Sequence, residues 1–115
     1  MIETGMSPRE WELAREAVDA IARVFEQHEG GVFDVGALRK LDHHAYTVRI
    51  STADAVCREK LGDIQDRAAV YFSSRCGDRG RREGTPSVES LSLEIEQAVG
   101  ALRARLQELG SAASA

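Results

Sequence analysis

The sequence predicts an all-α protein, a small up-and-down bundle of three to four helices that forms a single domain over residues 1–115. Apolar residues make up 43% of the chain, enough for one hydrophobic core, whereas aromatic residues make up only 5%. The core should therefore consist mainly of Leu, Ile, Val and Ala, as is typical of packed helices. The only two prolines, Pro8 and Pro86, stand where helices are expected to begin.

The first helix is expected to begin directly after Ser7. Ser7 is a good N-cap, Pro8 suits the first helical position, and Glu10 completes a capping box. Glycine favours helix C-termini, so the helix should end at Gly30 and Gly31. Its apolar residues recur at steps of three and four and so form one buried face: Trp11, Ala14, Val18, Ile21 and Phe25.

The second helix is expected to be capped by Asp34 and to break near residues 47–51, where β-branched residues weaken it. Ser51 and Asp54 then form an S-x-x-D capping box for a third helix. One long kinked helix over 35–75, or a short extended piece at the break, are the alternatives. The apolar seam of the second helix consists of Leu38, Leu41 and Ala45.

The third helix should bury one apolar side and end by Cys76 and Gly77, where a linker rich in glycine and charge begins. A flexible loop is therefore expected at about residues 76–84. Cys57 lies on the apolar side, which favours a buried structural thiol. That side consists of Ala53, Val56, Cys57, Leu61, Ile64, Ala68, Tyr71 and Phe72.

The last helix is expected to open at Thr85 and Pro86 and to stop at Gly110, with residues 111–115 as a frayed tail. Its near-heptad seam packs either within its own bundle or against a second copy. Because this seam is longer than a small bundle requires, it favours a homodimer. The expected interface residues are Leu91, Ile95, Leu102, Leu106 and Leu109.

Composition narrows the function classes. The formal net charge of −4 is unlike the basic balance that is usual in freestanding nucleic-acid-binding proteins. No segment approaches the roughly 18 apolar residues of a membrane span, and the N-terminus does not have a signal-peptide pattern. We therefore expect no membrane association, a cytoplasmic location and reduced thiols at Cys57 and Cys76. The cysteines and histidines do not fall at metal-site spacings, and no cofactor is predicted.

Arginines gather at the end of the third helix and in the following loop. Glycines leave that backbone free to follow a phosphate chain, and guanidinium groups match phosphate geometry. The alternative is a solvated loop in which Asp78 and Glu83 offset half of the positive charge. The sequence thus offers a possible nucleic-acid contact at Arg75, Arg79, Arg81 and Arg82.

A second candidate site is the pattern R-x4-H-x-Y, formed by Arg39, His44 and Tyr46. It resembles the motif of HEPN-family ribonucleases. That resemblance implies a small helical bundle that dimerises and cleaves RNA without a metal. Arg39 and His44 would then face their copies across a dimer groove, with Tyr46 in support. The alternative is a polar helix face with His43 and His44 at its solvent edge.

Helical geometry places a condition on this motif. Positions 39 and 44 lie about 140° apart around an ideal α-helix, so the helix must loosen or end there if both side chains are to enter one groove. The function that the sequence favours is a non-catalytic helical interaction protein, such as an adaptor, an assembly factor or a regulatory subunit. It would act on a protein partner or as a homo-oligomer. A HEPN-like ribonuclease or toxin acting on RNA is the alternative.

Overall fold

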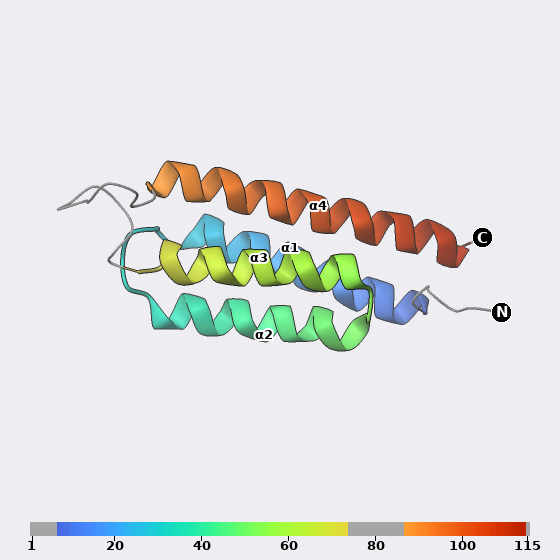
Figure 1. Ribbon diagram of the computed structural model, residues 1–115. Helices are drawn as coiled ribbons and strands as arrows, with labels where there is room; N and C mark the ends of the chain where they lie inside the picture. The colour runs from blue at the N-terminus through green and yellow to red at the C-terminus, as the bar shows by residue number, and fades with distance from the viewer. Residues whose placement is uncertain (1–6, 74–86, 115) are drawn as a thin grey trace.

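The computed structural model describes residues 7–73 and 87–114, and within these ranges the fold is a four-helix bundle (Figure 1). Successive helices run in opposite directions, as an up-and-down bundle requires, so the predicted fold class is confirmed. The helices are α1 (Pro8–Gln27), α2 (Val35–Ser51), α3 (Ala55–Tyr71) and α4 (Val88–Ser114).

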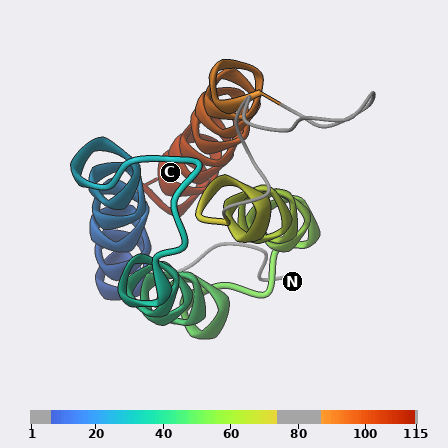
Figure 2. The ribbon, with the colours of Figure 1, turned by 90° about the vertical axis from the view of Figure 1, so that its left-hand side faces the viewer.

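Each helix occupies one corner of the bundle and packs against two neighbours. α1 contacts α2 and α4, and α3 contacts the same two helices (Figure 2). The backbones of the diagonal pairs α1–α3 and α2–α4 do not come close to each other in the described residues, although α1 and α3 meet through the rings of Phe25 and Tyr71. Every helix therefore keeps one flank toward solvent. No helix in the described ranges is both long enough and apolar enough to cross a membrane.

The core is aliphatic along most of its length, as the composition predicts. Aromatic side chains gather at one end, where the ring of Phe25 stacks on Phe72 at 5.5 Å and meets Tyr71 edge-on at the same distance. Ala53 and Val56 are exposed, so they do not belong to the buried side of α3 as predicted. The largest fully buried side chains are those of Phe72, Ile21, Leu41, Leu61, Ile64, Leu102 and Leu106.

The start of α1 is the predicted capping box. The Ser7 hydroxyl accepts the Glu10 amide at 3.1 Å, and the Glu10 carboxylate accepts the Ser7 amide at 3.0 Å. The helix ends at Gln27, before the predicted glycines. Gly31 has a φ of 80° and donates its amide to the Tyr71 carbonyl at 2.6 Å. These glycines therefore serve the turn that packs on the end of α3, where a Cβ on Gly30 would lie 2.5 Å from the Tyr71 ring.

Asp34 caps α2, as predicted, and also binds the end of α1. One carboxylate oxygen accepts the Ala37 amide at 3.0 Å, and the other lies 3.1 Å from Nδ1 of His28. The bond from Ala37 is the main reason why the pKa of Asp34 is lowered, with the contact to His28 acting in the same direction.

The break between α2 and α3 lies at residues 52–54, later than predicted. α2 continues through its β-branched stretch because Val48 is fully buried, and tertiary packing overrides weak helix propensity. Ser51 is not a cap, since its hydroxyl donates to the Thr47 carbonyl at 2.7 Å. Asp54 alone caps α3, accepting the Cys57 amide at 3.0 Å. Neither the single kinked helix nor the extended piece occurs.

α4 passes through Gly110 and continues to Ser114, so the predicted stop at Gly110 is wrong. Gly110 lies beside Trp11, where a Cβ would come within 2.5 Å of the indole Nε1. The glycine is therefore a packing requirement. The predicted interface seam is also revised, because its side chains are buried in the core of a single chain and offer no surface to a second copy: Leu91, Ile95, Leu102, Leu106 and Leu109.

Candidate interaction face on α2

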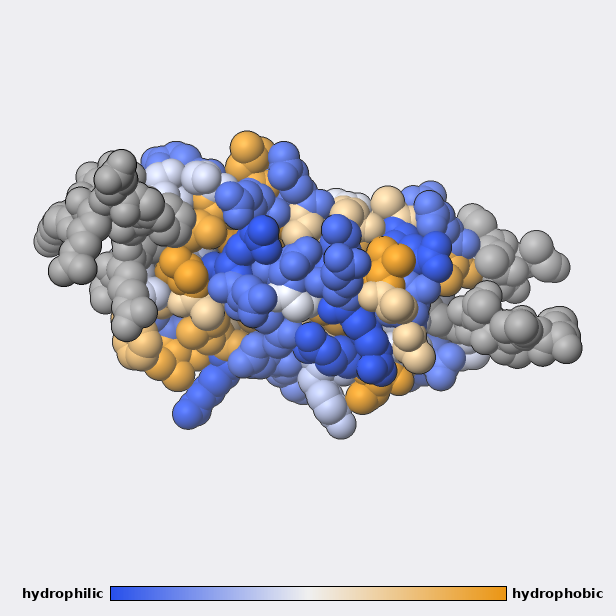
Figure 3. Space-filling view, in the orientation of Figure 1, coloured by the Kyte–Doolittle hydropathy of each residue, from blue (hydrophilic) through white to orange (hydrophobic). Residues whose placement is uncertain are grey.

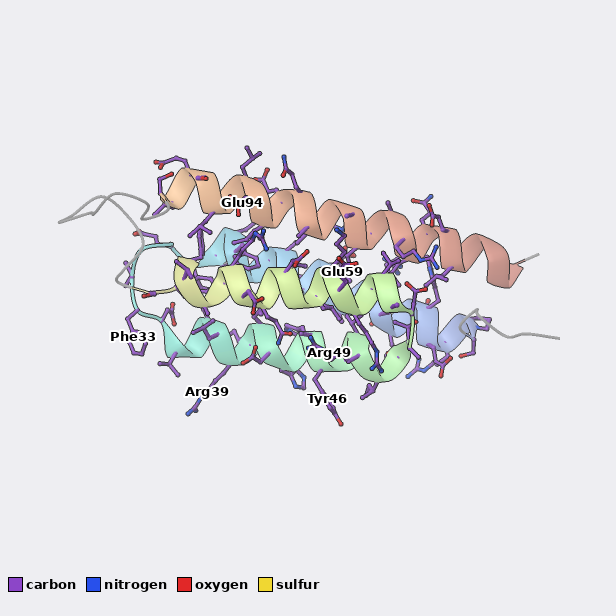
Figure 4. All side chains as sticks on the ribbon, viewed as in Figure 1. Phe33, Arg39, Tyr46, Arg49, Glu59 and Glu94 are labelled. Atoms are coloured by element: carbon purple, nitrogen blue, oxygen red, sulfur yellow. The ribbon has the colours of Figure 1, made fainter. Side chains whose placement is uncertain are left out.

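The three residues of the R-x4-H-x-Y pattern all lie on α2, and α2 is unbroken from Val35 to Ser51. Arg39 and His44 therefore leave the helix in directions about 140° apart. Arg39 and Tyr46 are exposed and point away from the bundle (Figure 4). Within one chain, the fold does not bring Arg39 and His44 into one groove.

His44 lies on a more buried side of α2 than Arg39 does. Its pKa is lowered, first by burial and then by the positive charges of His43 and of Arg23 on α1. The imidazole rings of His43 and His44 are 5.3 Å apart and meet edge-on. It is thus His43, four residues after Arg39, that lies nearest the direction of Arg39 and Tyr46.

An outward stripe on α2 combines apolar and basic side chains. Val35, Arg39, His43, Tyr46 and Ile50 follow one another at steps of four, four, three and four, which aligns them along one side of a helix. All five are exposed. We call these residues, together with Val32 and Phe33 in the preceding turn, the outer face of α2.

Exposed apolar side chains are concentrated on this face. Phe33, Tyr46 and Ile50 are 68%, 62% and 63% exposed. Of the seven large hydrophobic side chains that are exposed in the described residues, five belong to the outer face of α2. Figure 3 shows hydrophobic atoms at both ends of the edge that α2 forms, with hydrophilic ones between them. Val56 and Leu93, the other two, lie on α3 and α4.

The charge of α2 differs from that of its neighbours. Arg39, Lys40 and Arg49 against Asp42 give α2 a formal charge of +2. The same count gives −2 for α1, zero for α3 and −2 for α4. The Asp42 carboxylate also accepts a bond at 3.0 Å from Gln65 of α3. α2 is therefore a basic helix on an acidic protein, and Arg39 carries the formal charge of its outer face.

The sequence contains a signal for this face. Tyr46 and Ile50 fit a helical stripe with Arg39, but the predicted break near residues 47–51 separates Ile50 from the other two. A stripe that mixes cations with apolar residues does not stand out as amphipathic. Only the burial of Val48 and Ala45 on the opposite side of α2 shows which side faces solvent.

The other predicted sites have different outcomes. The four arginines of the proposed phosphate contact lie outside the described residues, as does Cys76: Arg75, Arg79, Arg81 and Arg82. Cys57 is fully buried, which confirms the structural thiol, and burial raises its pKa to about 12. Across the described ranges, no three side chains of the His, Cys, Asp or Glu type gather as metal ligands.

Comparisons with protein-family models, with curated proteins and with solved structures find no match to this chain. The chemistry of its own surface is therefore the basis for assigning a function.

Proposed function

We propose that this chain is a non-catalytic interaction protein that binds a partner protein through the outer face of α2. The partner contributes an acidic amphipathic helix. The observation that carries this proposal is the gathering of five of the seven exposed large hydrophobic side chains of the described residues on that face. Apolar side chains gathered on one surface are typical of a protein contact.

Tyr46 and Ile50 are the anchors of the proposed contact. They lie four residues apart, so they project side by side from one turn of α2 to the next. Burying a side chain of this size against a partner stabilises a complex by roughly 1.5–3 kcal/mol. A helix laid along α2 contacts such a stripe by ordinary helix–helix packing and extends the bundle by one element.

The charge of the face favours an acidic partner. Arg39 and Lys40 are exposed and precede Tyr46 by about two turns, and neither forms an ion pair with another described residue. Carboxylates flanking the apolar side of a partner helix would be attracted to these two cations. Such peripheral charges mainly raise the association rate and select the orientation of binding.

A second copy and a nucleic acid fit the face less well. Two copies joined face to face would bring together two α2 helices, each with a formal charge of +2. A nucleic acid would be held chiefly by cations on its phosphates, and α2 offers only Arg39, Lys40 and Arg49 beside an exposed Phe33 and Ile50.

The proposal is tested by site-specific crosslinking in the native cell. A photoreactive benzoylphenylalanine replaces Tyr46 in one variant and Leu93 in the matched control. Leu93 is also an exposed apolar residue, 56% accessible, but it lies on α4. We expect the Tyr46 variant alone to form a specific protein adduct, and mass spectrometry to place the crosslink in an acidic helical segment.

Three outcomes would overturn the proposal. The same adducts from both positions would indicate non-specific contact. Crosslinks from position 46 to another copy of this chain would make the face a self-association surface. Adducts with RNA, or no adducts at all, would contradict the proposal that a partner protein binds this face.

A further inference from the structure

A hollow of about 350 Å³ lies between α1 and α4, on a different flank of the bundle from the outer face of α2. Figure 2 shows α1 and α4 side by side, with α2 on the far side of α1. Val18 and Leu106 contribute buried apolar surface to the lining, and Trp11 forms a wall. A hollow of this size is at the lower end of the range of small-molecule sites, which is roughly 300–1,000 Å³.

The wall formed by Trp11 is held in place. Its indole Nε1 donates a hydrogen bond to the Leu106 carbonyl at 2.6 Å, which ties α1 to α4. The absence of a side chain on Gly110 allows this close approach, as a Cβ there would meet the indole. The aromatic wall is therefore already oriented without a ligand, and binding would not have to order it.

The rim of the hollow carries a net charge of +1. Asp19 lies between two arginines, 2.9 Å from an Nη of Arg103 and 3.5 Å from an Nη of Arg15. The Arg15 guanidinium also lies 5.6 Å from the centre of the Trp11 ring. Each guanidinium carries five N–H donors, so one carboxylate shared between two of them leaves donors for a second. Both arginine side chains are about half exposed and accessible to solutes.

We infer that this hollow binds a small amphipathic carboxylate, with its hydrocarbon body against Trp11, above the buried Leu106, and its charged group on the N–H donors of Arg15 and Arg103 that Asp19 leaves open. The apolar lining selects for a hydrocarbon body, and the net positive rim selects for a single negative charge. Bidentate bonding between guanidinium and carboxylate fixes the orientation. This site is independent of the interaction face on α2.

The sequence provides a reporter, because Trp11 is the only tryptophan in the chain. The full chain is titrated with octanoate, below its micelle concentration, while tryptophan fluorescence is recorded. The control solute is 1-octanol, which has the same hydrocarbon chain without the charge. We expect saturable binding of octanoate that is about tenfold tighter than that of octanol, as expected for one charge-assisted contact.

Arg15→Gln and Arg103→Gln are each expected to weaken octanoate binding about tenfold and to leave octanol binding unchanged. Arg67→Gln is the matched control, because Arg67 pairs with Glu94 at 2.8 Å on the α3–α4 side and should have no effect. Arg15 makes only the longer contact to Asp19, so its variant should fold normally. A fluorescence change that does not saturate, equal affinities for octanoate and octanol, or an equal effect of Arg67→Gln would overturn the inference.

Discussion

At the scale of single residues, Asp54 connects two helices of the bundle, α3 and α4. Its carboxylate caps α3 at the Cys57 amide and accepts two bonds from the Arg105 guanidinium of α4, at 2.7 and 3.0 Å. The bonds from Arg105 are the main reason why the pKa of Asp54 falls from 3.8 to about 2. Its side chain is only 11% exposed, so solvent screens this pair weakly.

Asp54→Asn is expected to lower the free energy of unfolding at pH 7 by about 2 kcal/mol, measured by denaturant titration. Asparagine caps a helix nearly as well as aspartate, so the loss reports the pair with Arg105. The folded pKa is depressed, so this stabilisation is present above pH 3.8 and is lost as the pH falls through about 2.

The difference between wild type and Asp54→Asn should accordingly shrink in acid. Asp63→Asn is the matched control, since Asp63 is 40% exposed and lies 3.8 Å from its partner Arg67. It should change stability little. A difference for Asp54→Asn that is constant from neutral pH to pH 2 would show that the pair with Arg105 is not the stabilising contact.

The sequence predicted helix caps correctly where the local pattern allowed only one N-cap residue. Ser7 and Asp34 each precede a clear apolar helix, and both cap as predicted. Ser51 and Asp54 were predicted to form one capping box together, whereas Asp54 alone caps α3. The choice depends on Arg105, which lies 51 residues after Asp54 and secures it as the cap. Local sequence cannot supply that information.

At the scale of elements, the glycines of α4 have two different roles. Gly100 has open space where a Cβ would be, whereas Gly110 is enclosed by the Trp11 indole. Both lie inside a continuous helix. From sequence alone, a glycine late in a helix is assigned to the helix end. The role of Gly110 depends on a tertiary contact with α1, which the local sequence does not reveal.

Gly100→Ala is expected to stabilise the protein by roughly 0.5–1 kcal/mol, because alanine has the better helix propensity and meets no neighbour. Gly110→Ala should instead destabilise it by roughly 1–3 kcal/mol, because the new methyl group displaces the indole from its bond to Leu106. Thermal unfolding with tryptophan fluorescence measures both. Stabilisation by both variants would show that Trp11 does not pack on Gly110.

Periodicity located the buried seam of α4 correctly but not what covers it. A heptad-like seam is equally suited to three neighbours in one chain and to a second copy. Leu102 and Leu106 are buried within their own bundle, so they are not accessible for the predicted dimer contact. The outer face of α2 was not apparent from periodicity either, because polar residues (Arg39 and His43) lie between its apolar ones.

At the scale of the whole molecule, short connections and four apolar seams sufficed to predict an up-and-down bundle. They did not predict how charge is distributed over it. The chain carries −4 in total, yet α2 carries +2 between two acidic or neutral neighbours. The closed bundle buries the longest seam and leaves the outer face of α2 as the main exposed apolar surface among the described residues.

The most direct test of this account is the affinity of the purified crosslinked partner for variants of the outer face of α2. Tyr46→Ser and Ile50→Ser should each weaken binding by about tenfold or more without unfolding the chain, because both side chains are exposed anchors. Leu93→Ser should bind like the wild type. Arg39→Glu should slow association and reduce its dependence on salt. Equal affinity of the partner for wild type, Tyr46→Ser and Ile50→Ser would contradict the assignment of this face as the interaction surface.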